Sequence, residues 1–247
     1  MLVYSITKGR MTLYQELVQR FTGQLQLTQP PVGLSFVEDA PEGVAHTEGR
    51  VPSACTFWRR AEQGVFYAAG EDHSECPIGM MTMGFIMPES EQQRAQLLVE
   101  TMASVQYFSP SEVSALPVVK KPHQSIVYGR LDQFPIEADV VLCIIDTQQA
   151  MLIAEAMGNM NWLQSGGQSA FGRPTCAIIP RTLHTNQLSM SFGCVGARTY
   201  TGLTPSELVL TIPGSQFAVL VERLQTAVNA NAALAPFHQG QKARFAI

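Results

Sequence analysis

The chain of 247 residues is long enough for one large domain or two small ones, and with 46% hydrophobic residues it can bury a substantial core. A net charge of −4, with basic runs no longer than the pair Lys120 and Lys121, excludes the clustered cations of a nucleic-acid-binding protein. No stretch reaches the ~18 apolar residues of a membrane span and the first residues lack a signal-peptide core, so we expect a cytoplasmic protein with reduced thiols.

The first half of the chain alternates predicted helices with predicted strands. Apolar residues spaced at i, i+3, i+4 and i+7 follow Thr12, which forms a capping box with Gln15. Residues 1–11 then form an N-terminal extension. The predicted elements are a helix at 12–25, a strand at 32–37, a short helix after Ser53, a strand at 65–69 and a helix that begins near Ser90.

The second half shows a similar alternation after a loop-like stretch at 106–124. The run VVLCIID is almost wholly apolar, which is typical of a strand buried on both faces. The predicted elements are strands at 125–131, 139–146, 187–192 and 207–212, a helix at 150–157, and a last helix from Ser215 that frays after about residue 233.

This alternation predicts an α/β or α+β fold with mixed sheet covered by helices. A cysteine pattern that occurs twice predicts that the fold has two related halves and arose by internal duplication. Cys55 and Cys76 lead to an early glycine, Gly79, and Cys176 and Cys194 lead to Gly196. The expected domains are the extension 1–11, a first half-repeat 12–110, a second half-repeat 111–232 packed with the first as one domain, and a C-terminal tail 233–247.

The cysteines are the candidate ligands of a cofactor. Thiolates bind zinc, copper(I), iron–sulfur clusters and haem iron, and four thiolates are enough for a closed site. Cys76 is the best single candidate for a metal ligand, because it lies in a polar turn close to His73. Cys194 is its counterpart, in a glycine-rich segment where the backbone can approach a ligand closely.

Other interpretations of the cysteines stay open. The chain has no CxxC pair, on which most zinc and ferredoxin signatures depend. Free cysteine also serves as a small apolar residue in protein cores, and this is the expected role of Cys143 in its buried strand. Cys76 and Cys194 could alternatively form a redox disulfide between the two halves.

A few residues outside the cysteines could contact a ligand. Trp58 and Trp162 are predicted at matching places in the two halves, where they could enclose a flat ligand. The glycine-rich segment 165–172 could grip an anion through its backbone N–H groups, with Arg173 and Arg198 as counter-charges. Core packing and solvated surface arginines are the alternatives for these residues.

Five short motifs resemble a known family. They are PVGLSF at 31–36, the cysteine at 55 followed by an aromatic residue, ECPIG at 75–79, GRPTCAIIP at 172–180 and SFGCVGAR at 191–198. In this order they are similar to the uncharacterised family called domain of unknown function 169, or ArCR, over about residues 12–228. The resemblance implies that Cys55, Cys76, Cys176, Cys194 and Gly196 are family-pattern positions, and it implies no activity.

The leading hypothesis for function is a cytoplasmic cofactor-binding protein. An iron–sulfur cluster, a haem or another soft-metal cofactor would lie between the two halves and could be redox-active. A cofactor site would include Cys55, Cys76, Cys176, Cys194, His73, Gly79, Gly196, Trp58 and Arg198. The alternatives are a metal-free module that binds a small molecule and a thiol-dependent enzyme with Cys76 or Cys194 as nucleophile. The low charged fraction, 15%, favours a homo-oligomer.

Overall fold

The computed structural model describes residues 2–158 and 173–245, with side chains from Tyr14 onward. This part of the chain forms one seven-stranded sheet with the strand order β2-β3-β4-β1-β5-β7-β6. Neighbouring strands are antiparallel except for the parallel pair β2 and β3. The strands are β1 (Val32–Val37), β2 (Ala45–His46), β3 (Phe66–Ala69), β4 (Ser125–Arg130), β5 (Val140–Asp146), β6 (Ser189–Ser191) and β7 (Glu207–Pro213).

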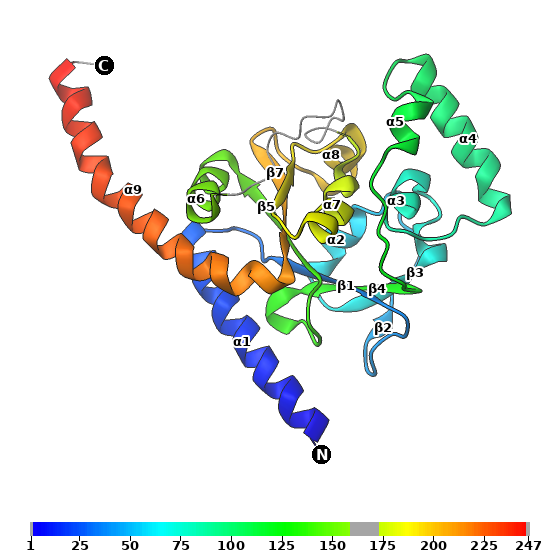
Figure 1. Cartoon of the computed structure of the whole chain (residues 1–247), viewed down its shortest axis with the longest axis horizontal. Helices are drawn as coiled ribbons and strands as arrows, with labels where there is room; N and C mark the ends of the chain where they lie inside the picture. The colour runs from blue at the N-terminus through cyan, green and yellow to red at the C-terminus, as the bar shows by residue number, and fades with distance from the viewer. Residues whose placement is uncertain (1, 159–172, 246–247) are drawn as a thin grey trace.

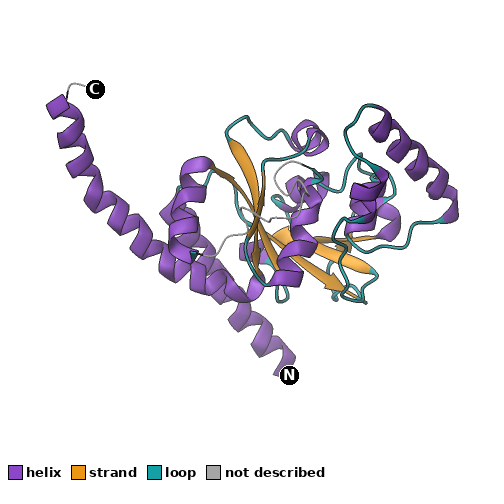
Figure 2. Ribbon diagram, turned by 45° about the horizontal axis from the view of Figure 1, so that its top comes forward, coloured by secondary structure: helices purple, strands orange, loops and turns teal. Residues whose placement is uncertain are grey.

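Helices cover both faces of this sheet (Figures 1 and 2). The α-helices are α1 (Leu2–Leu25), α2 (Thr56–Ala61), α3 (Pro77–Thr82), α4 (Glu89–Ser104), α5 (Pro110–Ser114), α6 (Thr147–Met157), α7 (Ile178–Thr185), α8 (Val195–Thr201) and α9 (Phe217–Phe245). Short 3-10 turns are η1 (Gly70–His73), η2 (Leu131–Gln133), η3 (Thr175–Ala177) and η4 (Gly214–Gln216). Among the described residues no helix is long and apolar enough to cross a membrane.

Side chains that alternate along the strands build two separate cores. In β5, Val141 and Cys143 belong to the core that faces α1, α6 and α9. Their neighbours Val140 and Leu142 belong to the core on the other face, with residues of α2, α7 and α8. Successive strand residues point to opposite faces, so the apolar run of β5 serves both cores.

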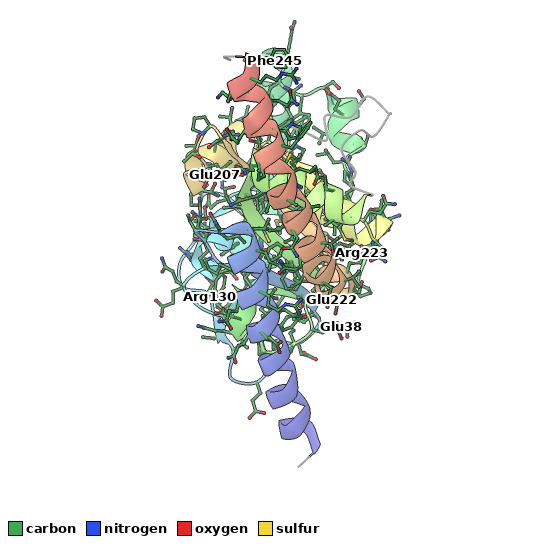
Figure 3. The ribbon with its side chains drawn as sticks, turned by 90° about the vertical axis from the view of Figure 1, so that its left-hand side faces the viewer. Glu38, Arg130, Glu207, Glu222, Arg223 and Phe245 are labelled. Carbon is green, nitrogen blue, oxygen red and sulfur yellow. The ribbon has the colours of Figure 1, made fainter. Side chains whose placement is uncertain are left out.

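The two long helices α1 and α9 pack against each other at one side of the molecule (Figure 3). The rings of Phe21 and Phe217 meet edge to face with their centroids 5.1 Å apart. Leu220 and Leu224 of α9 are fully buried in the same core. Beyond Ala227, α9 leaves the body and carries Phe245 at its far end.

The predicted fold class is confirmed as a mixed sheet covered by helices, but the internal duplication is not shown. The strands of the two expected halves are interleaved, because β4 of the expected second half lies between β3 and β1 of the first. The boundary between residues 110 and 111 therefore stays a prediction.

Most predicted elements are present, with differences at their ends. Helix α1 begins at Leu2 rather than near Thr12, so the expected extension is part of that helix. The stretch 106–124 contains α5, which the capping box of Ser109 and Glu112 starts. Helix α9 continues to Phe245, where fraying after residue 233 was predicted. Cys143 is buried at 2% exposure, as expected of a core residue.

Candidate functional site

Four of the five cysteines line one cavity. Its volume is about 480 Å³, within the range of about 300–1,000 Å³ that is usual for small-molecule sites. It lies on the face of the sheet that α2, α7 and α8 cover, and the α3–α5 segment forms its other side. The cysteines that line it are Cys55, Cys76, Cys176 and Cys194. We call this cavity the four-cysteine pocket.

The helices place these cysteines. Cys55, Cys76 and Cys194 are the N-cap residues of α2, α3 and α8, and Cys176 lies in η3, which leads directly into α7. The N–H groups of the first helical turn have no partner within their helix and point toward the cap. The backbone N–H of Ala197 donates to Cys194 Sγ over 3.4 Å. The side chains of Cys55 and Cys76 make no such cap bond.

The four sulfur atoms differ in exposure and influence one another. Cys55 and Cys176 are each 4% exposed, whereas Cys76 and Cys194 are half-buried at the open side. Burial, and then the charges of Cys176, Cys194 and Cys76, raise the pKa of the Cys55 thiol, which the Ser53 hydrogen bond lowers in part. Burial is also the largest cause that raises the pKa of Cys176. Four thiolates in this pocket repel one another, so a bound cation would stabilise them together.

Hydroxyl groups hold the segments in place behind the sulfur atoms. The Thr82 hydroxyl lies within 3.2 Å of Cys176 Sγ and within reach of two carbonyl oxygens of its own helix. The backbone N–H of Cys194 donates to Thr175 Oγ1 over 2.6 Å. This bond ties the start of α8 to η3, and it thereby fixes the position of Cys194 relative to Cys176.

The two glycines of the predicted site have different roles. A Cβ atom on Gly79 would lie 2.8 Å from Cys76 Sγ and 2.9 Å from the Cβ of Ala54. Only glycine fits there without moving the Cys76 sulfur. A Cβ atom on Gly196 would meet only Tyr200, at 3.9 Å, which is ordinary van der Waals contact.

An aromatic wall closes one side of the pocket. Tyr107 and Phe108, from the turn after α4, pack edge to face with their centroids 5.5 Å apart. Burial raises the pKa of Tyr107, and a backbone hydrogen bond from Val195 opposes this effect. Arg173 lies over both rings. Neither Tyr107 nor Phe108 was predicted as a site residue; the available signal was their position just before the SPSE capping box.

Three predicted site residues, His73, Trp58 and Arg198, do not line the pocket. His73 is fully buried, with Nδ1 2.7 Å from the Ala69 carbonyl oxygen and Nε2 3.0 Å from the Tyr128 hydroxyl. Trp58 is 1% exposed and packs in the core rather than along the cavity. Trp58 is large and mostly apolar, so it packs in the core, and the two hydrogen bonds of His73 allow its ring to be buried.

The side chain of Arg198 hydrogen-bonds to backbone carbonyl oxygens. Its guanidinium donates to the carbonyl oxygens of Phe192, Thr204 and Glu207, and this braces the loop between α8 and β7. It is absent from the lining of the four-cysteine pocket, unlike Arg173. Trp162 and the segment 165–172 lie outside the described residues.

The described side chains contain no group of three or more His, Cys, Asp or Glu residues that could hold a metal ion. A tetrahedral zinc site needs its sulfur atoms about 2.3 Å from one central ion. The four cysteines line the same cavity without meeting around one such point.

Comparison with known proteins identifies the family. The family model of DUF169, described as uncharacterised ArCR, matches residues 20–223. The chain belongs to the DUF169 family. All four pocket cysteines lie within the matched region. A relative described as the uncharacterized protein MJ0308 of Methanocaldococcus jannaschii is 25% identical over 223 residues, which cover 85% of this chain and 93% of the relative. No solved structure matches the chain.

Proposed function

We propose that this DUF169 protein binds an iron–sulfur cluster in the four-cysteine pocket and uses it in electron transfer or a redox reaction. One observation carries the proposal: four cysteines from four separate segments line one cavity of about 480 Å³. Four thiolates are the ligand set of the common [2Fe–2S] and [4Fe–4S] clusters. The number of free thiols fits a reducing compartment, so a cytoplasmic location is part of the proposal.

We propose a cluster rather than a single metal ion because of the size of the cavity. A single ion draws three or four ligand atoms to one point, and the described side chains hold no such group. A cluster places its own iron and sulfide atoms between the thiolates, which therefore stand farther apart. The volume of the pocket leaves room for these atoms.

The pocket residues would tune such a cluster in a way that follows from their contacts. Burial, and then the repulsion between the sulfur atoms, raise the pKa of Cys55, and the positive charge of iron would oppose both effects by holding bound thiols deprotonated. The Ala197 N–H and the Thr82 hydroxyl already lie within hydrogen-bonding distance of Cys194 and Cys176. Hydrogen bonds to ligand sulfur raise the reduction potential of a cluster.

A metal-free small-molecule-binding module is the second candidate. The aromatic pair Tyr107 and Phe108 beside a cavity of this volume supports it. The thiol-dependent enzyme has weaker support, because a nucleophilic cysteine needs a nearby base. His73, the base that the sequence offered, has both ring nitrogens engaged by Ala69 and Tyr128.

The test is anaerobic purification of the full chain, followed by a visible spectrum and assays of iron and acid-labile sulfide. We expect a brown protein with broad absorbance in the visible region. Cys76→Ser and Cys194→Ser should each lower the iron content. Cys143→Ser is the matched control, because Cys143 is buried on the opposite face of the sheet and should leave the iron content unchanged.

The controls separate the candidates. A folded, colourless chain that takes up no iron and sulfide on anaerobic reconstitution contradicts the cluster and leaves the metal-free module. A sharp Soret band without sulfide would replace the cluster with a haem. Equal iron content in all three serine variants would remove the pocket cysteines as ligands.

A further inference from the structure

The charged side chains that line the four-cysteine pocket differ in whether an opposite charge pairs with them. Its lining contains two charged residues among those described, Glu75 and Arg173. The Glu75 carboxylate pairs with Arg50 at 3.1 Å and with Arg94 at 2.5 Å, and Arg94 also pairs with Glu91 at 3.6 Å. These two acids and two bases neutralise one another at the rim.

Arg173 has no such partner among the described residues. Its guanidinium carbon lies 4.6 Å from the ring centroid of Tyr107 and 5.2 Å from that of Phe108. Its Nε atom is buried without a hydrogen-bond partner, and no carboxylate of the described residues forms an ion pair with it. The Ser109 hydrogen bonds, and to a lesser extent the charge of Arg173, lower the pKa of Glu112. The Glu112 carboxylate already accepts a hydrogen bond from the Ser109 backbone N–H over 2.7 Å.

Stacking fixes the orientation of a guanidinium without neutralising it. Two aromatic rings hold Arg173 in place, and its charge borders a cavity that is large enough for a ligand. A planar guanidinium that is held in this way matches the two oxygen atoms of a carboxylate or the oxygen atoms of a phosphate group. A buried N–H without an acceptor favours any ligand that supplies one.

We infer that the four-cysteine pocket binds a small organic anion, whose carboxylate or phosphate group pairs with Arg173 while its apolar body packs on the Tyr107 and Phe108 wall. The side chains of Leu98 and Met102 extend this apolar wall from α4. The acidic group of the ligand would then lie in the same cavity as the half-buried sulfur atoms of Cys76 and Cys194.

The inference that the pocket binds an anion depends only on Arg173 and the lining of the pocket. The further idea that this anion is a substrate of the cofactor rests on the function proposed above. The test is therefore made on the full chain without metal, where the two ideas can fail separately. A chain that binds no iron would still report on the anion site through the thiols that line it.

Two alkylating reagents of similar size serve as probes: iodoacetate, which is anionic, and iodoacetamide, which is neutral. Both react with a thiolate, form a carbon–sulfur bond and release iodide. The rate of labelling at Cys76 is measured for each reagent by mass spectrometry of its peptide. The ratio of the two rates cancels any change in the thiolate fraction, and it reports the attraction of the pocket for an anion.

We expect Arg173→Gln to lower the ratio of the iodoacetate rate to the iodoacetamide rate by about threefold to fivefold, the effect of one nearby charge in a largely aqueous setting. Arg173→Lys, which keeps the charge, should retain most of the ratio. Arg223→Gln is the matched control, because Arg223 lies on α9, on the other face of the sheet (Figure 3), and it should leave the ratio unchanged.

An unchanged ratio in Arg173→Gln would overturn the inference. The iodoacetamide rate of each variant shows whether its pocket is intact. If Arg173→Gln does not fold, Arg173→Lys and a competition experiment on the wild-type chain still test the inference. Phenyl phosphate or benzoate at about 10 mM, well above the roughly millimolar dissociation constant expected of a single-arginine site, should slow iodoacetamide labelling of wild-type Cys76 severalfold. The uncharged benzyl alcohol should not slow it. Equal labelling with and without both anions contradicts the anion site.

Discussion

The Nε2 atom of His73 accepts a hydrogen bond from the Tyr128 hydroxyl over 3.0 Å in the closed core beside the four-cysteine pocket. The direction follows from Nδ1, which lies 2.7 Å from the carbonyl oxygen of Ala69. A carbonyl oxygen only accepts, so Nδ1 carries the proton and Nε2 is the acceptor. Burial, the largest cause, lowers the pKa of His73 to about 4.

This neutral histidine makes stability depend on pH. The unfolded chain takes up a proton near pH 6.5 and the folded chain only near pH 4, so protonation favours unfolding. His73 therefore costs no stability above pH 6.5 and removes up to about 3 kcal/mol as the pH falls toward 4. The measurement is urea unfolding of wild type and of the His73→Phe/Tyr128→Phe double variant. The double variant should lose less stability over this window, and parallel curves would contradict the assignment.

Gly79→Ala should damage the pocket, because the new Cβ would lie 2.8 Å from Cys76 Sγ. Overpacking of this kind costs about 1–3 kcal/mol. We expect a lower free energy of unfolding and, if the cluster is present, a lower iron content after reconstitution. Gly196→Ala is the control at the matching place of the other cysteine segment. Its Cβ has space, and alanine favours the helix, so it should be neutral or slightly stabilising.

Thr175→Val should loosen the start of α8. The substitution keeps the shape of the side chain and leaves the Cys194 N–H without its acceptor at 2.6 Å. An unsatisfied buried donor costs about 1–3 kcal/mol, which chemical unfolding measures. Thr199→Val is the control, because Thr199 is exposed and its hydroxyl only donates to Val195 within the same helix. A loss of stability as large in the control as in Thr175→Val would contradict the role of the bond.

Removal of residues 233–247 should leave the fold intact. The last buried residue of α9 is Ala227, and from Ala232 to Gly240 every residue is exposed. A helical end without packing adds little to stability, so the free energy of unfolding should change by less than about 1 kcal/mol. Light scattering of both forms also tests the predicted homo-oligomer. A larger loss of stability, or a smaller number of chains per particle in the truncated form, would show that the end of α9 packs against another copy.

The sequence predicted the central elements of the fold well and their ends less well. The apolar runs of β1 and β5 identified their strands within a residue because burial on both faces demands such runs. The first turn of α4 was placed near Ser90, whereas Pro88 is its N-cap and makes no side-chain cap bond. Helix ends depend on local hydrogen bonds that several nearby residues can supply, so the sequence alone leaves a choice.

The sequence also named the residues of the pocket more reliably than their roles. Cys55, Cys76, Cys176 and Cys194 are recognisable from their doubled spacing and their family motifs. His73, three residues before Cys76, was also predicted to belong to the cofactor site. Its ring turns instead toward Tyr128, because the core beside the pocket accepts a neutral histidine with two hydrogen-bonding partners.

The amino-acid sequence by itself determined which segments become strands and helices, and which thiols are distinctive. Both follow from local patterns of apolar and cysteine residues. Only the tertiary structure decided that the cysteines of four separate segments share one cavity with Arg173 and Tyr107, while the side chain of Cys143 packs on the opposite face of the sheet. The physical reason is that the strand order and the packing of helices on each face set these distances, and residues far apart in the chain contribute to both.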